Sequence, residues 1–161
     1  MFAGKDPMLK ITLASLHLLA LGLGLGAVIV RGAALRESPS AATLGRVLRA
    51  DTLWGVAAAL WLATGLWRLF AGTEKPPAYY YGNGLSLAKL GLFALVCALE
   101  VRPMLTLIRW RAARRAGAPA EQVMAAATRR KIATISQIEA VVVVIMVFLG
   151  AAIARGYGLL G

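Results

Sequence analysis

Apolar residues are concentrated in four long stretches, separated by shorter stretches that are rich in polar and basic residues. The apolar stretches cover residues 9–30, 52–71, 85–108 and 132–154. Each is close to the ~20 residues that cross the ~30 Å hydrocarbon core of a bilayer as a helix. The alternation expected of a transmembrane β-barrel is absent. The pattern therefore predicts an all-α integral membrane protein, built as one antiparallel four-transmembrane-helix bundle over residues 1–161.

The composition supports this fold class and excludes several kinds of site. Of the 161 residues, 60% are hydrophobic and 16% are charged, whereas a soluble domain carries about 25% charged residues. Cys97 is the only cysteine and His17 the only histidine. Zinc sites with three or four protein ligands and a disulfide within the chain are therefore excluded.

The basic residues predict the orientation of the bundle. The net charge is +11, and twelve of the 18 Lys and Arg residues lie within residues 31–49 or 102–131, at the loops that follow the first and third stretches. Under the positive-inside rule these two loops face the cytoplasm. Both termini then lie on the outer, periplasmic side of a bacterial inner membrane, in a multi-pass protein.

The loop after the third stretch, residues 104–131, is basic and amphipathic around Trp110. Such a segment beside a membrane binds anionic lipid headgroups. We expect no nucleic-acid partner, because Gly117 and Pro119 interrupt the stretch and no recognition-helix pattern surrounds it. Glycines in the first stretch, Gly22 and Gly26, form a small-xxx-small pair that allows close helix packing, and a homo-oligomer is expected.

His17 lies inside the first stretch, about 12 Å from its outer boundary at ~1.5 Å per residue. An ionisable group at this depth is costly unless it faces a partner or a ligand, so His17 is the first candidate site residue. Gly24, seven residues on, lies on the same helix face and leaves room for a flat ligand beside the imidazole.

Lys89 is the second unusual residue, about 6 Å inside the outer boundary of the third stretch. It shares a helix face with Phe93 and Glu100, since eleven residues bring an α-helix back to within about 20°. The alternative for Lys89 is snorkelling to the outer headgroups. Trp61 and Phe93 are candidate walls of a pocket, with ordinary helix packing as the alternative.

Further charges lie near the opposite, cytoplasmic side of the spans. They predict a buried charge network that fixes the helix register, and a proton path is the alternative use of the same groups. The members of this network are Arg31, Asp51, Glu100, Arg102 and Glu139.

A haem needs only one strong protein ligand from a chain, so single-histidine ligation by His17 is metal chemistry that this inventory supports. Two His17 side chains across a dimer are the other arrangement. Copper bound by His17 with Met8 or Met146 is weakly indicated, because the methionines are scattered.

Several motifs together resemble a bacterial family of four-helix membrane proteins catalogued only as a domain of unknown function. The resemblance covers nearly the whole chain. The motifs are Leu16-His17, Ala50-Asp51-Thr52-Leu53-Trp54-Gly55, Gly65-Leu66-Trp67-Arg68, Glu74-Lys75, Lys89, Leu107-Ile108-Arg109-Trp110-Arg111 and Ala154-Arg155-Gly156.

That family more remotely resembles the superfamily of HemJ-type protoporphyrinogen oxidases and CopD-type copper-resistance proteins. HemJ members place a haem-linked histidine in the first helix and an essential lysine in the third, which correspond here to His17 and Lys89. The HemJ pattern after the first helix is replaced here by Val30-Arg31-Gly32-Ala33.

The resemblance implies binding of haem b, with electron transfer or porphyrin-linked oxidoreduction. His17 would be the axial ligand, and Lys89 the candidate catalytic residue that neutralises a propionate or positions a substrate carboxylate. Two other functions remain open. One is a non-enzymatic assembly or lipid-interacting protein, and the other is a small transporter with a proton or ion relay through His17, Lys89 and Glu100.

Overall fold

The computed structural model describes residues 6–71 and 75–160, and this part of the chain is helical throughout its regular elements. Lys5 and Glu74, which contributed to the sequence patterns above, lie outside the described residues. The helices are α1 (Pro7–Ala34), α2 (Ala41–Phe70), α3 (Pro77–Tyr81), α4 (Gly84–Arg115), α5 (Ala120–Val123) and α6 (Ala126–Ala154).

The four long helices, α1, α2, α4 and α6, are each long and apolar enough to cross a membrane. They cover the four predicted stretches apart from Ala71, and each begins before its stretch. α4 has 32 residues, or about 48 Å of helix against a ~30 Å hydrocarbon core. Polar turns of the long helices therefore continue past the hydrophobic region.

Two helix features follow from local chemistry. Ser40 Oγ accepts a hydrogen bond from the Thr43 amide and starts α2, so residues 43–49 belong to this helix. Pro103 lies inside α4, which continues through it to Arg115. A proline lacks one helical hydrogen bond, and Pro103 is fully buried within α4.

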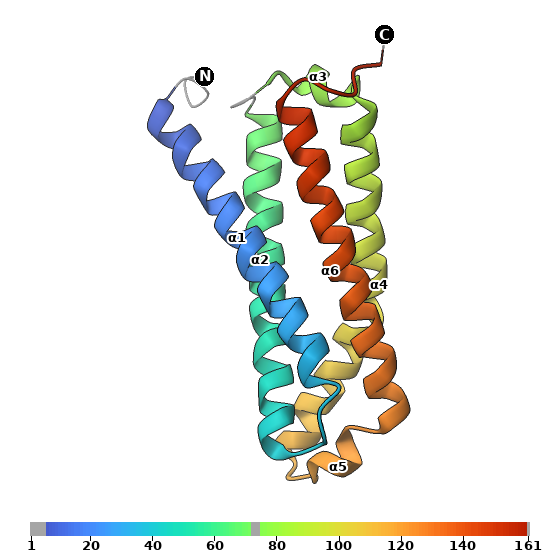
Figure 1. Cartoon of the computed structure of the whole chain (residues 1–161). Coiled ribbons are helices and arrows are strands. Elements are labelled where there is room, and N and C mark those ends of the chain that lie inside the picture. Colours follow the sequence, from blue (N-terminus) through green and yellow to red (C-terminus); the bar gives the residue numbers. More distant parts are fainter. Residues whose placement is uncertain (1–5, 72–74, 161) are drawn as a thin grey trace.

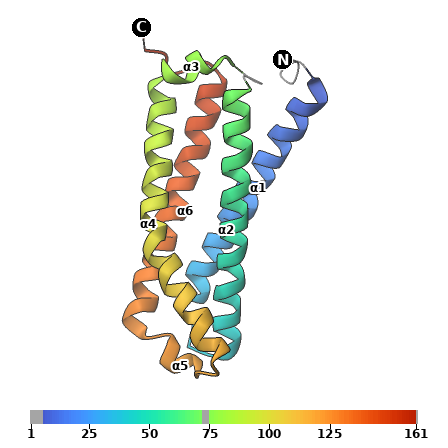
Figure 2. The same cartoon turned by 180° about the vertical axis from the view of Figure 1, so that it is seen from behind.

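The long helices pack as an α1–α2 pair and an α4–α6 pair, joined mainly by α1 against α6. Figure 1 places both ends of the described chain and α3 at one end of the bundle, and α5 at the other. These are called the α3 end and the α5 end below. The half of α1 nearest the α3 end leans away from the other helices, as the reverse view in Figure 2 also shows.

The core consists of two apolar clusters stacked along the bundle. One lies toward the α5 end, around Leu35, Leu107 and Met124. The other lies in the middle, around Val28 and Met146. Many other large apolar side chains are exposed, including Leu18 at 64% and Phe148 at 71%, as expected of surfaces that face lipid.

The connection before α4 is fastened to the end of the chain. Asn83 Nδ2 donates to the Tyr157 carbonyl oxygen at 2.8 Å, and the Gly84 amide donates to the Gly158 carbonyl oxygen at 2.8 Å. Gly158 has φ +88°, and a Cβ there would lie 2.5 Å from Leu85 Cγ. Only glycine fits this position, which closes the α3 end.

Candidate functional site

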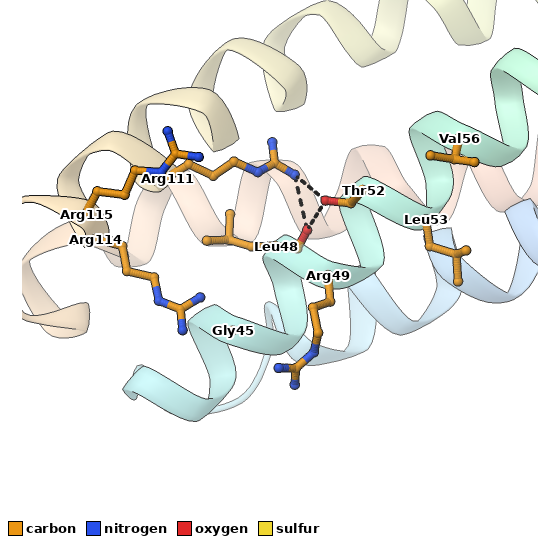
Figure 3. Close-up of a pocket in the computed structure, with 9 residues that line it drawn as sticks. All are labelled: Gly45, Leu48, Arg49, Thr52, Leu53, Val56, Arg111, Arg114 and Arg115. Carbon is orange, nitrogen blue, oxygen red and sulfur yellow. Dashed lines mark hydrogen bonds between the residues drawn. The ribbon is translucent and has the colours of Figure 1, made fainter.

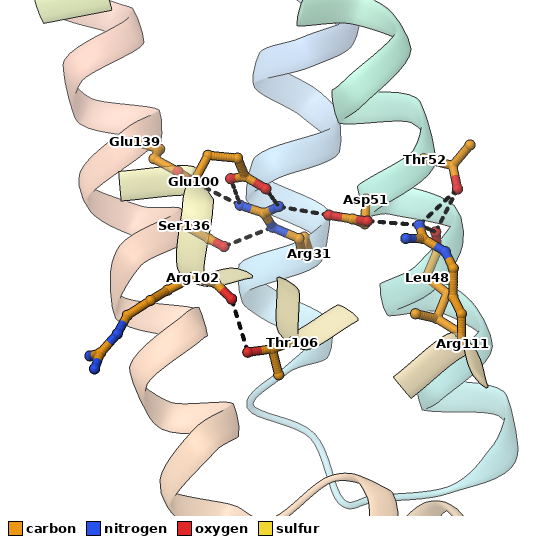
Figure 4. Close-up of polar contacts among 10 residues, drawn as sticks. All are labelled: Arg31, Leu48, Asp51, Thr52, Glu100, Arg102, Thr106, Arg111, Ser136 and Glu139. Atoms are coloured by element: carbon orange, nitrogen blue, oxygen red, sulfur yellow. Dashed lines mark hydrogen bonds and ion pairs between the residues drawn. The ribbon is translucent and has the colours of Figure 1, made fainter. Parts of the chain in front are cut away.

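Arg31 lies at the centre of a buried charge cluster formed by all four long helices (Figure 4). Its Nη1 donates to Asp51 Oδ1 at 2.9 Å and to Glu100 Oε1 at 2.7 Å. Its Nη2 donates to Glu100 Oε2 and to Glu139 Oε2, both at 2.7 Å. The Arg31 and Glu139 side chains are 0% exposed. A guanidinium removed from water in this way is tolerated only because every donor group meets an acceptor.

Ser136 completes the cluster, because Arg31 Nε donates to its Oγ at 3.0 Å. Ser136, Glu139, Val143 and Met146 of α6 are all buried, so this face of the helix turns inward. The cluster thus ties α1 to α2, α4 and α6 between the two apolar clusters.

Four of the five residues predicted for the charge network belong to it, and Arg102 does not. Arg102 is exposed and Figure 4 shows its guanidinium directed away from the cluster. Arg111 takes that place, since its Nη2 donates to Asp51 Oδ2 at 2.7 Å and to the Leu48 carbonyl oxygen at 3.1 Å. The physical reason is helical rotation: Arg102 is two residues, about 200°, from Glu100, whereas Arg111 is eleven residues away and returns to the same face.

Carboxyl groups outnumber guanidinium groups within this cluster. Asp51, Glu100 and Glu139 face Arg31 and Arg111, and Glu139 Oε1 is buried without a hydrogen-bond partner. One proton or one additional cation would neutralise the excess. The cluster is otherwise closed, so its geometry supports a structural role in setting the helix register.

His17 lies nearer the α3 end, in a second polar site. Its Nδ1 is 2.9 Å from Thr64 Oγ1, and Thr64 Oγ1 is 2.8 Å from the Leu60 carbonyl oxygen. A hydroxyl has one proton to donate. In the tautomer that carries Nδ1–H, His17 donates to Thr64 Oγ1, and the Thr64 hydroxyl donates to the Leu60 carbonyl oxygen. In that tautomer Nε2 carries the lone pair, which is the arrangement by which a second residue orients a metal-ligating histidine.

Trp61 joins His17 to Lys89. The rings of His17 and Trp61 stack at 5.1 Å between centroids and 21° between planes. Lys89 Nζ lies 5.6 Å from the centroid of the Trp61 ring, and the Phe93 ring lies 5.5 Å from it. His17, Lys89, Trp61 and Phe93 thus lie together, on three helices.

The polar groups of this second site have few partners. Among the described residues, Lys89 Nζ forms no hydrogen bond or ion pair, and its contacts are the Trp61 ring and the space beside Gly150. Trp61 Nε1 is buried without an acceptor. The charge of Arg68, one helical turn beyond Thr64, also acts on His17 and on Lys89. Positive charge and unused donors favour an anionic ligand here.

The space beside His17 is provided by Gly65 and not by Gly24 as the sequence indicated. Gly24 does not leave space for a ligand, because a Cβ there would lie 3.3 Å from Trp54, whose indole fills that space. Gly65, which the sequence reasoning missed, is the residue that admits the imidazole: a Cβ on it would lie 3.2 Å from His17 Cε1. Thr64 was missed as well, and the spacing Trp61, Thr64, Arg68 along one face of α2 was the available signal.

The glycine pair Gly22 and Gly26 packs against no helix in the described part of the chain, since a Cβ on either would have nothing within 4 Å. The same part holds no group of three or more His, Cys, Asp and Glu side chains placed to bind a metal ion.

Comparison with known proteins gives one match. Residues 9–158 match the model of a family described as predicted membrane proteins, DUF2214. No curated protein and no solved structure matches the chain. Because the match covers nearly the whole length, the chain belongs to this family, and it is a multi-pass membrane protein with four candidate spans.

Proposed function

We propose that this member of the DUF2214 family binds haem b at the His17 site and serves in electron transfer or porphyrin-linked oxidoreduction. The observation that carries the proposal is the 2.9 Å hydrogen bond between His17 Nδ1 and Thr64 Oγ1 inside a candidate membrane span. It engages Nδ1, so that Nε2 is the nitrogen that would bind iron. A haem with one protein ligand needs this group and no other metal-binding side chain.

The neighbouring residues fit the rest of such a ligand. Trp61 stacks on the face of the imidazole. Lys89 Nζ and Trp61 Nε1 are donors without acceptors, suited to the carboxylates of a porphyrin. Phe93 supplies an apolar wall.

Bound haem would supply reversible one-electron transfer at its iron. The residues of this chain would bind, orient and charge-balance it. Thr64 holds the imidazole through Nδ1, Gly65 lets the ring approach α2, and Lys89 offsets a propionate or positions a substrate carboxylate. The HemJ-like oxidase activity remains the enzymatic form of this proposal, with Lys89 as the residue that would contact substrate.

The relay alternative has weaker support from the geometry. Val96 and Met146 belong to the apolar cluster between Lys89 and the Arg31 cluster. Trp61 and Phe93 also pack against that cluster. A proton or ion path from His17 to Glu100 would have to cross it.

The orientation follows from charge. The α5 end carries the two arginine-rich loops, and the positive-inside rule assigns it to the cytoplasm of a bacterial inner membrane. The bundle is then antiparallel with both termini outside, and the His17 site lies in the outer half of the membrane.

The test is a visible spectrum of the detergent-purified full chain, oxidised and then reduced with dithionite. We expect a Soret band that shifts on reduction at near-stoichiometric haem. His17→Ala should abolish the band, while Thr12→Ala, an exposed change in the same helix, should leave it unchanged.

Two results would contradict haem binding by His17. One is a colourless wild-type protein that stays colourless after haem is added. The other is an unchanged spectrum in His17→Ala that elutes as the wild type does on size exclusion.

A further inference from the structure

A groove of about 590 Å³ lies between α2 and α4 toward the α5 end (Figure 3), and His17 is not among its lining residues. Four arginines contribute to its lining: Arg49, Arg111, Arg114 and Arg115. The other lining residues are apolar or small, apart from Thr52, and none is acidic. The groove therefore combines strong positive charge with an apolar wall.

Two of the guanidinium groups converge on Gly45. Arg114 Nη2 and Arg49 Nη1 lie 3.7 Å and 3.8 Å from the position that a Cβ on Gly45 would take. Figure 3 shows the two side chains approaching from α4 and α2 on either side of this glycine. Within the described part of the chain, neither guanidinium forms a hydrogen bond or an ion pair. Like charges held this close, over bare backbone, are suited to a phosphate between them.

Arg111 is different, because Asp51, Thr52 and the Leu48 carbonyl already engage its Nη2. It fixes one side of the groove and adds positive charge. The phosphate-binding role therefore falls mainly on Arg49 and Arg114.

The apolar wall continues from these arginines into the membrane span. Leu53 and Val56 are 43% and 61% exposed and lie one and two turns beyond Arg49 on α2, about 6 and 10 Å along the helix. A free phosphate would not contact Leu53 or Val56. An amphiphile whose apolar chain lies along α2 would cover both side chains.

A second groove of about 370 Å³ meets the first at Arg49 and Leu53, which line both. It follows the open face of Gly22 and Gly26 on α1 and is lined by Arg46 as well. The two grooves together provide one basic site for a headgroup and two apolar channels that lead from it. This arrangement matches a lipid with one headgroup and two acyl chains.

We infer that the α5 end holds an anionic phospholipid. Its phosphate lies between Arg49 and Arg114 above Gly45, one acyl chain runs along Leu53 and Val56, and the other runs along the Gly22–Gly26 face. The site is independent of haem binding, because it shares no residue with the His17 site.

The experiment is native mass spectrometry of the full chain in detergent, with equal amounts of phosphatidylglycerol and phosphatidylcholine added. The wild type should retain phosphatidylglycerol in preference to phosphatidylcholine. The double variant Arg49→Gln/Arg114→Gln should lose about 30-fold of that preference, since each basic contact with an anionic lipid surface contributes about fivefold.

The matched control is Arg109→Gln/Arg130→Gln, which removes the same charge from exposed arginines that line neither groove. It should keep the preference. A second variant, Gly45→Leu, keeps every charge and fills the space between the guanidinium groups. It should lose phosphatidylglycerol as the double arginine variant does.

Three results would overturn the inference: equal loss in the control pair, equal retention of phosphatidylcholine by the wild type, or full binding by Gly45→Leu. Inorganic phosphate distinguishes the source of the anion. If millimolar phosphate alone displaces phosphatidylglycerol, the site is one for free phosphate and the lipid assignment fails.

Discussion

The Arg31 cluster and the His17 site are both polar regions inside one apolar bundle, and they differ in how their hydrogen-bonding groups are satisfied. In the Arg31 cluster, every guanidinium nitrogen of Arg31 donates to an oxygen of another helix. In the His17 site, one hydrogen bond to Thr64 is made, while Lys89 Nζ and Trp61 Nε1 form none in the described part of the chain.

The Arg31 cluster is also more tightly surrounded by helices than the His17 site. The Arg31 cluster lies between two apolar clusters where all four long helices meet. The His17 site lies on the half of α1 that leans away from the bundle (Figure 1). A closed polar group stabilises the fold, whereas an open one is available to a ligand.

The largest effect is expected for Arg31→Met. It leaves Asp51, Glu100 and Glu139 without their shared cation, and breaking a buried ion pair costs about 3–5 kcal/mol. Thermal unfolding in detergent should show a strongly lowered midpoint. Adding Glu139→Gln to Arg31→Met should recover part of the loss, because one uncompensated charge is removed.

Lys89→Met is the matched control from the other region and should unfold close to the wild type. If Arg31→Met and Lys89→Met lowered the midpoint equally, the contrast between closed and open polar sites would be lost.

A smaller effect is expected for Arg111→Gln, which removes a 2.7 Å ion pair to Asp51 at the edge of the cluster. The expected cost is about 1–3 kcal/mol, since a largely buried carboxylate loses one partner. Arg102→Gln removes the same charge from an exposed side chain of the same helix and should change stability by no more than about 0.5 kcal/mol. Equal unfolding midpoints for the two variants would contradict the assignment of Arg111 to the cluster.

The smallest effect on stability is expected for Thr64→Val, about 1 kcal/mol for one hydrogen bond. Its effect on ligand binding should be larger, because loss of the group that orients a metal-binding histidine weakens affinity about 10–100-fold. Haem titration followed by absorbance would measure this. Thr134→Val is the control, since Thr134 makes the same type of bond to a carbonyl one turn back, at 3.0 Å, and has no ring partner. Matching haem affinities in the two variants would argue against a role for Thr64.

Helical periodicity predicted which residues share a face, and it did so well within single helices. Lys89, Phe93 and Glu100 face inward on α4 as the eleven-residue repeat implies. The same repeat, applied once more from Glu100, leads to Arg111. Choosing Arg102 instead followed proximity in sequence, which ignores rotation about the helix axis.

Contacts between helices were harder to predict. The pairing of His17 with Thr64 and Gly65 depends on which helices are neighbours and on their vertical register. Neither follows from the period of one helix. Gly24 shows the same limit, because the sequence reveals a missing side chain but not that Trp54 fills the space.

The partners of Arg31 also constrain how the protein is made. Arg31 ends the first span, whereas Glu100 and Glu139 follow 69 and 108 residues later. A chain that enters the membrane span by span must therefore keep the Arg31 guanidinium hydrated until α4 and α6 arrive. We therefore expect this residue to stay at the membrane surface during synthesis and to become part of the core only when the last helix assembles.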